Sequence, residues 1–242
     1  MEKFYLCIKL ISDASFSRGD GLTGEVDNEI QYDYLGCPFI NARTIKGILV
    51  EECADILHAI PDHKRKFFEK GAKKLFGMPG EVMDHNQIFQ FGNAYLPDDF
   101  RKLLKSDLEQ KVSREVNSGS EVHSKVNRIN RELQSSILHS ITSIRTQTAI
   151  DDDGVAREHS LRAIRVVMRQ TIFEAEILFS GTEEEKGETL PILAACVKSF
   201  RRAGSHRNRG LGKIDVSLED STLARVDITN EWFTRFEKEV KQ

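Results

Sequence analysis

The chain has 242 residues, of which 39% are hydrophobic and 30% charged, and its formal net charge is −3. These values are ordinary for a soluble globular protein, and any binding of nucleic acid must come from a local basic patch. No apolar run approaches the about 18 residues of a membrane span, and the N-terminus lacks a signal-peptide pattern. The four cysteines form no C-x-x-C pair, so we expect a cytoplasmic protein without membrane contact, disulfide framework or structural zinc.

The N-terminal segment predicts a strand followed by a long loop. Apolar and polar residues alternate over 3–11, which is typical of a strand with one buried face. The following segment, 12–34, is polar and contains three glycines. It has too few apolar residues for a place in the core, so we expect a surface loop.

Helical periodicity begins after the loop. Apolar residues at i, i+3 and i+4 predict a helix over 42–60, with Asn41 as its N-cap and Pro61 as its stop. A shorter and more basic helix is predicted over 62–76, and 87–96 is predicted to be a strand. Residues 97–145 are highly charged and helical in tendency, with Gly119 as the expected break. They indicate an insertion on the main domain.

The second half of the chain begins with a predicted hairpin, whose turn residues are Asp152, Asp153 and Gly154. This half of the chain is predicted to contain, in order, strands over 146–156 and 161–179, a helix over 188–202, a glycine-rich loop over 204–212, a strand over 213–218 and a short helix over 230–241.

The order strand, helix, strands, helix, strand predicts an α+β fold on the ferredoxin-like, or RRM-like, plan, in which two helices back an antiparallel sheet. Such sheets often bind single-stranded RNA. We expect one domain over 1–242. Its core would comprise about 1–96 and 146–220, with a helical insertion over about 97–145 and a C-terminal segment over 221–242.

Two cations lie in the first turn of the first predicted helix. A cation at that end of the helix dipole is disfavoured by roughly 0.3–1 kcal/mol, so helix stability does not explain Arg43 and Lys46. A phosphate at this helix start would be bound by free backbone N–H groups and by both side chains. The alternative is that both are solvated charges, paired with acids of the preceding loop such as Glu25, Asp27 or Asp33.

The segment from residue 198 to residue 213 is basic and contains no acid. Its glycines allow the backbone to approach a ligand closely. Its candidate RNA-binding residues are Arg202, His206, Arg207, Arg209 and Lys213. Arg202 has another explanation, because a cation near a helix C-terminus complements the dipole. His206 is suited to acid–base chemistry or to a polar contact with RNA.

Four aspartates lie in the first loop, namely Asp13, Asp20, Asp27 and Asp33. A lone loop aspartate is usually a turn residue or an N-cap. Asp27 is distinguished by its place before the basic helix start. It could hold a divalent ion near a scissile phosphate, or orient or deprotonate a ribose 2′-hydroxyl, and the pattern does not decide between these roles.

Taken together, these segments resemble the CRISPR-associated RAMP superfamily, and more narrowly the repeated backbone subunit of type III effector complexes. The resemblance is carried by Glu25-Val26-Asp27-Asn28-Glu29-Ile30-Gln31-Tyr32-Asp33, Pro38-Phe39-Ile40, Thr44-Ile45-Lys46-Gly47, Leu75-Phe76-Gly77, Phe91-Gly92-Asn93-Ala94, Ala149-Ile150-Asp151, Gly154-Val155-Ala156, Phe173-Glu174-Ala175-Glu176-Ile177 and Arg207-Asn208-Arg209-Gly210-Leu211-Gly212. It covers almost the whole chain except the charged insertion.

The resemblance implies a palm with a thumb β-hairpin and a role in RNA-guided cleavage. Copies of the chain would stack along a guide RNA beside other effector subunits. Each thumb would kink the duplex of guide and complementary target RNA, and a loop aspartate would cut the target with Mg²⁺ or another divalent cation. Matched by position, that aspartate is Asp27, as catalytic residue and metal ligand. Lys46 and the loop 207–213 would hold the guide.

Two alternatives stay open. Related backbone subunits bind guide RNA without cutting, so the chain can be a scaffold. Related RAMP endoribonucleases process repeat RNA, and these normally pair a histidine with basic residues instead of using a loop aspartate.

Overall fold

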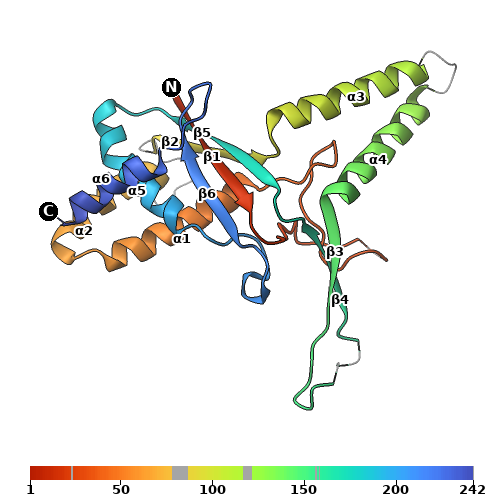
Figure 1. The fold of residues 1–242 in the computed structure, drawn as a ribbon, viewed down its shortest axis with the longest axis horizontal. Coiled ribbons are helices and arrows are strands. Elements are labelled where there is room, and N and C mark those ends of the chain that lie inside the picture. Colours follow the sequence, from red (N-terminus) through yellow and green to blue (C-terminus); the bar gives the residue numbers. More distant parts are fainter. Residues whose placement is uncertain (23, 78–86, 117–121, 156, 158, 242) are drawn as a thin grey trace.

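The structure is a computed structural model that describes residues 1–22, 24–77, 87–116, 122–155, 157 and 159–241. Its elements, labelled in Figure 1, are β1 (Glu2–Leu10), α1 (Ala42–Ala59), α2 (Asp62–Phe76), β2 (Phe89–Tyr95), α3 (Asp98–Val116), α4 (Val122–Ile141), β3 (Thr142–Gln147), β4 (Arg162–Val167), β5 (Ile172–Phe179), α5 (Glu183–Ser199), the 3₁₀ helix η1 (Arg207–Arg209), β6 (Ile214–Glu219) and α6 (Thr229–Lys241). Within the described residues, no helix is both long enough and apolar enough to cross a bilayer.

The larger sheet has four antiparallel strands in the order β2-β5-β1-β6. The alternation expected for the first strand is confirmed, because the even-numbered residues of β1 from Phe4 to Leu10 are buried. In this register Leu6 lies between Ala175 of β5 and Leu218 of β6, so the buried residues of three strands form one apolar face.

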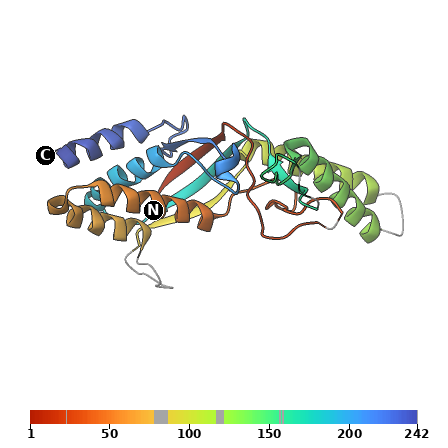
Figure 2. The ribbon, with the colours of Figure 1, turned by 90° about the horizontal axis from the view of Figure 1, so that it is seen from below.

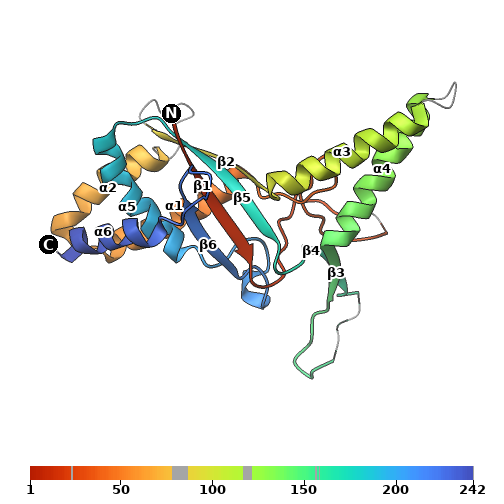
Figure 3. The same ribbon diagram turned by 45° about the horizontal axis from the view of Figure 1, so that its top comes forward.

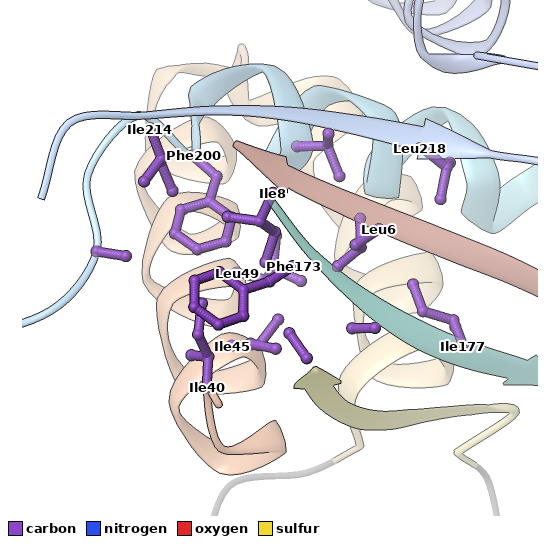
Figure 4. Packing of buried hydrophobic residues seen from close by; sticks show 14 of the residues in the cluster. Leu6, Ile8, Ile40, Ile45, Leu49, Phe173, Ile177, Phe200, Ile214 and Leu218 are labelled. Atoms are coloured by element: carbon purple, nitrogen blue, oxygen red, sulfur yellow. The ribbon is translucent and has the colours of Figure 1, made fainter. Parts of the chain in front are cut away.

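The helical layer covers that apolar face. α1 packs on β2 and α5 packs on β6, and the two helices also contact each other. In Figure 4, Ile45 and Leu49 of α1 and Phe200 after α5 meet Ile8 and Phe173 of the sheet. α2 and α6 pack against α5 farther out, at the end of the molecule opposite α3 and α4 (Figure 2). The mixed α/β class with an antiparallel sheet and helices is therefore confirmed.

The opposite face of the sheet is less covered and carries charged side chains. Its acidic residues are Glu174, Glu176, Asp215 and Glu219, and its basic residues are Lys3 and Lys9. Lys3 pairs with Glu176 at 2.8 Å, and Arg225 pairs with Glu174 at 2.6 Å. This face is more acidic than basic and is a poor surface for a polyanion.

Two projections leave the body at the same end (Figures 1 and 3). One is the pair α3–α4, which confirms the helical character of the segment after residue 97; the expected break at Gly119 lies outside the described residues. The other is the hairpin of β3 and β4, residues 142–167, in which Gln147 pairs with Arg162. Its expected turn is confirmed, since Gly154 has φ +79° and donates its N–H to the Asp151 carbonyl at 3.1 Å.

Three sequence-based expectations about elements are wrong. The strand expected over 161–179 is divided, because β4 pairs in the hairpin and β5 in the larger sheet, with Gln170 in the left-handed region between them. The strand expected over 146–156 is shifted, because β3 begins at Thr142, within the segment expected to be insertion, and already ends at Gln147. α5 begins at Glu183, earlier than expected, because Thr182 and Glu185 form a capping box.

The first loop also differs from expectation. It was expected to lie outside the core, yet Ala14, Phe16, Val26 and Ile30 are buried. These few apolar side chains suffice because they fill the junction between the sheet and the hairpin. The loop is therefore a packed part of the molecule, which gives its aspartates defined positions.

Candidate functional site

Asp27 lies beside the hairpin, near the outer end of the β3–β4 ladder. Its Oδ2 atom accepts the backbone N–H of Ala163 in β4 at 2.7 Å. Its Oδ1 atom lies 3.6 Å from Nη1 of Arg162, and the Asp27 side chain is 45% exposed. The carboxylate is thus oriented by the hairpin and still reachable from solvent.

The backbone around Asp27 is bound to β4. The Asp27 N–H donates to the Ala163 carbonyl at 2.8 Å, and the Arg165 N–H donates to the Asn28 carbonyl at 3.1 Å. This stretch of the first loop therefore runs along β4 as a short parallel partner, with Asn28 opposite Ile164. The loop and the hairpin are one unit at this point.

A hollow of about 450 Å³ opens beside Asp27, lined by Gly21, Leu22, Gly24, Glu25, Val26 and Asp27. Its floor requires a glycine, because a Cβ atom on Gly21 would lie 2.5 Å from the Val26 carbonyl oxygen and 2.6 Å from that of Asp27. Backbone approaches this close leave no room for a side chain, so Gly21 supports the position of Asp27.

The loop acids pair with arginines of the hairpin and of α3, not with the start of α1. Glu25 lies 3.3 Å from Arg165, and Asp33 lies 2.8 Å from Arg101. The alternative in which Arg43 and Lys46 neutralise these loop acids is therefore wrong. Asp27 itself faces the hairpin and not the basic helix start.

The start of α1 and the glycine-rich loop meet across a groove of about 350 Å³. Its lining includes Asn41 and Thr44 of the helix start and Ser205 and Arg207 of the loop. Asn41 is confirmed as the N-cap, since its side-chain oxygen accepts the Arg43 N–H at 2.8 Å. The groove combines hydroxyl groups and a cation, which are groups that bind phosphate. The free N–H groups expected at this helix start are not found, because those of Thr44 and Ile45 donate to the Asn41 carbonyl and that of Ala42 donates to Asn93.

The other candidate cations lie around this groove at different places. Arg207 is exposed and lies 3.9 Å from Glu51 of α1. Arg209 is exposed and donates to Gln147 of β3 at 3.4 Å, so the glycine-rich loop also reaches the hairpin. Arg43 is exposed on α1, while Lys46 donates from its Nζ atom to Gln87 at 3.0 Å, beside β2.

Three residues of the basic segment 198–213 have separate environments. Arg202 donates to the carbonyl of Arg207 and so stabilises the loop. The Nδ1 atom of His206 lies 3.2 Å from the Ser205 hydroxyl, on a residue with φ +59°. Lys213 lines another cleft, of about 720 Å³, together with Lys198 and Arg201. The structure thus gathers Arg207 and Arg209 near the groove and places Lys213 apart from it.

Judged from the described residues, a metal at Asp27 would complete its shell with water or with the RNA. In the part of the chain that the structure describes, no three His, Cys, Asp or Glu side chains are grouped as a metal site would need. Mg²⁺ commonly binds to one or two carboxylates and completes its shell with phosphate oxygens and water. Asp27 fits that mode when a polynucleotide is present.

Sequence reasoning missed Arg162, Arg165 and Glu29. Glu29 stands in a loop that was expected to be exposed, and Arg165 lies 136 residues away along the chain. No local pattern signals such a pairing. The only hint is the position of both arginines in the strand that returns from the predicted hairpin turn.

Comparisons with known proteins agree with this architecture. The family model described as "RAMPs: RAMP superfamily" matches residues 8–215. A chain from a type III-B Cmr-beta complex bound to cognate target RNA has a TM-score of 0.59 and 17% identity, over 90% of this chain and 97% of that chain. The apo state of type III-B Cmr-beta gives a TM-score of 0.57 at 17% identity, with the same coverage.

A third similar structure is an oligomeric Cmr4 from Pyrococcus furiosus, with a TM-score of 0.49 and 12% identity over 92% of this chain and 100% of that chain. No protein of curated function matches the sequence significantly. The family match covers most of the chain, and the two Cmr-beta structures share its fold over nearly their whole length. The chain therefore belongs to the RAMP superfamily.

Proposed function

We propose that this chain is a backbone subunit of a type III CRISPR effector complex, which binds guide RNA and cleaves complementary target RNA through Asp27. Membership of the RAMP superfamily supports the class of protein, and the similarity to chains of Cmr-beta complexes supports the type of complex. The observation that carries the cleavage step is the hydrogen bond between the Asp27 carboxylate and Ala163, near the outer end of the β3–β4 ladder. Copies of the chain and other effector subunits are its proposed partners in the cytoplasm.

We assign the sheet to the ferredoxin-like plan. The strand order β2-β5-β1-β6 and the connections β1-α1-β2 and β5-α5-β6 support this assignment. In this plan the hairpin and the α3–α4 pair are additions between β2 and β5. They bring the RNA-binding groups to one end of the sheet, away from its acidic open face.

In the proposed complex, the groove between α1 and the glycine-rich loop holds the guide backbone. Arg207 in the groove and Arg209 beside it supply charge there, and Thr44 and Ser205 supply hydroxyl groups. Arg209 also contacts the hairpin at Gln147, so the RNA would pass from the groove towards the outer end of the β3–β4 ladder. The target strand would then lie beside Asp27.

At the cleavage step, Asp27 is proposed to orient or deprotonate the attacking hydroxyl. Oδ2 is held by Ala163, so Oδ1 is the oxygen left to bind the hydroxyl or the metal. Arg162 is 68% exposed and can turn from Asp27 towards a phosphate oxygen. A divalent cation bound at Asp27 would stabilise negative charge developing on the phosphate.

A non-cleaving scaffold is the second candidate function. It is favoured by the fact that both Asp27 oxygens already have partners, and by the lack of a three-ligand cluster among the described residues. The third candidate, a nuclease that processes repeat RNA, would use His206 among the basic residues of its loop. Cleavage of repeat RNA by the isolated protein in the presence of a chelator would favour that candidate.

The deciding experiment gives the assembled complex a labelled complementary RNA and Mg²⁺. We expect regularly spaced cuts from the wild type and a loss of about 100-fold or more in rate for Asp27→Asn, with RNA binding intact. Asp20→Asn is the matched control, because it removes an exposed carboxylate of the same loop, and it should cut normally. Absence of cuts by the wild type would leave the scaffold function.

A further inference from the structure

A buried ion pair joins the Asp27 loop to the hairpin. Glu29 is 0% exposed and Arg165 is 1% exposed. The Nε atom of Arg165 donates to both carboxylate oxygens of Glu29, at 3.0 and 3.1 Å. Buried charges are costly unless they are paired and hydrogen-bonded, so this pair needs an explanation.

The remaining groups of the pair are also satisfied. Arg165 donates from Nη1 to the Thr142 hydroxyl at 3.4 Å and from Nη2 to Glu25 at 3.3 Å. Glu29 accepts the N–H of Ile30 at 2.8 Å. One guanidinium therefore connects β4 with β3 and with two places in the first loop, which lie on either side of Asp27 along the chain.

Stability alone does not call for this arrangement. A buried ion pair replaced by apolar residues of similar volume is often neutral or even stabilising. Contacts between apolar residues do not fix an orientation, whereas the planar guanidinium binds a carboxylate in only a few orientations. A slip of one residue along a strand would move the bound loop by about 3.3 Å and turn its side chains to the other face.

We propose that the Glu29–Arg165 pair is a positioning device that fixes the register of the Asp27 loop on β4. Neither residue touches RNA in this proposal; both act through Asp27, whose side chain is half exposed. With respect to cleavage, the inference rests on the proposed function. With respect to the register of the loop, it stands only on the Glu29–Arg165 ion pair and on the backbone hydrogen bonds between the loop and β4.

The test compares three variants in the full-length chain. Glu29→Leu leaves the guanidinium with one acidic partner and should lower Tm by roughly 10 °C. The double variant Glu29→Leu/Arg165→Met removes both charges and should recover most of that Tm. Glu29→Gln keeps the volume of the side chain and one acceptor oxygen, but it removes the charge and replaces the other oxygen by an NH2 donor. It provides a folded variant if the others fail to fold.

Hydrogen exchange gives the readout that is independent of cleavage. In the double variant and in Glu29→Gln, the amides of Asp27 and Arg165, which bond across the loop and β4, should exchange at least about tenfold faster. Amides between β1 and β5 should be unchanged. Wild-type exchange at Asp27 and Arg165 in a folded double variant would overturn the inference, whatever the complex does to RNA.

Cleavage by assembled complexes gives the second readout. If the wild type cuts, the double variant should cut about 100-fold more slowly, or at shifted positions, despite its recovered Tm. Recovery of both Tm and wild-type cleavage would show a merely structural pair. If the wild type does not cut, the proposed function fails, and hydrogen exchange alone decides the inference. Lys74→Met/Glu188→Leu is the matched control, since it removes a pair between α2 and α5.

Discussion

At the scale of single residues, the position of Asp27 also depends on neighbours that have no polar side chain. Gly21 is the clearest case. Gly21→Ala would place a Cβ atom 2.5 Å from the Val26 carbonyl oxygen, so the loop must shift. We expect cleavage by the assembled complex to fall at least about tenfold, while Tm falls by only a few degrees. Gly47→Ala in α1 is the control, because its Cβ atom would meet no atom within 4 Å. Gly24→Ala is unsuitable as a control, because Gly24 has φ +86°.

Asp13 is a second residue whose role is visible only in the structure. Burial alone would raise the pKa of its carboxyl, but hydrogen bonds from Arg145 and from the N–H of Arg169 lower the pKa below its usual value of 3.8. A lowered folded pKa means that the ionised form stabilises the fold above the unfolded pKa. This contribution is lost as the pH falls below about 4 through the folded pKa.

Asp13→Asn should therefore remove a pH-dependent part of the stability. We expect the variant to be less stable by about 1 kcal/mol at pH 7, and the difference from the wild type to shrink as the pH falls from 5 towards 2. Urea unfolding across this pH range measures it. A difference that stays constant with pH would contradict the role assigned to the ionised carboxylate.

At the scale of elements, the hairpin is more than a link between two strands. Beyond the last pair of the β3–β4 ladder it exposes three apolar side chains, Ile150, Val155 and Leu161. Exposed apolar residues on a projection need a partner, and apolar side chains are used to part stacked bases. In the proposed complex these residues would contact the guide–target duplex.

The hairpin prediction uses Ile150→Ser/Val155→Ser. Both side chains are exposed, so the free energy of unfolding should change by less than about 0.5 kcal/mol each. Cleavage by the assembled complex should lose its regular spacing or fall about tenfold. Leu223→Ser, in the exposed turn before α6, is the control and should behave as wild type. An unchanged cleavage ladder in the double variant would remove the hairpin from the reaction.

At the scale of the whole molecule, a basic segment lies near the hairpin although the chain as a whole is acidic. The chain has a net charge of −3 and an acidic open sheet face, yet the glycine-rich loop near the hairpin is basic. One copy would hold only a few nucleotides in the groove, so a monomer should bind RNA weakly and an assembly tightly.

Arg207→Gln/Arg209→Gln should weaken guide binding for all sequences. The slope of log K against log[salt] should become shallower by up to about 2, because each phosphate contact contributes about 1. Arg235→Gln/Lys238→Gln removes the same charge from α6, at the other end of the molecule, and should leave the slope unchanged (Figure 1). Equal effects of the two double variants would mean that only net charge matters.

Local signals in the sequence determined the larger part of the fold. The alternation of β1, the Asn41 cap of α1 and the turn before Gly154 depend on neighbouring residues, so a sequence pattern is enough to predict them. The order of these elements also led to the RAMP resemblance, which the family match confirms. The choice of Asp27 among the loop aspartates came from that resemblance.

Tertiary structure alone decided where those residues meet. The division of 161–179 into β4 and β5 depends on which partner strand each half finds. The burial of Glu29 against Arg165, and the contact of Asp27 with Ala163, join positions 136 residues apart. Periodicity and caps act over a few residues, whereas these contacts exist only after the chain has closed on itself. The sequence by itself therefore determined the elements and the family. Only the folded chain decided that Asp27 contacts the hairpin and not the basic helix start.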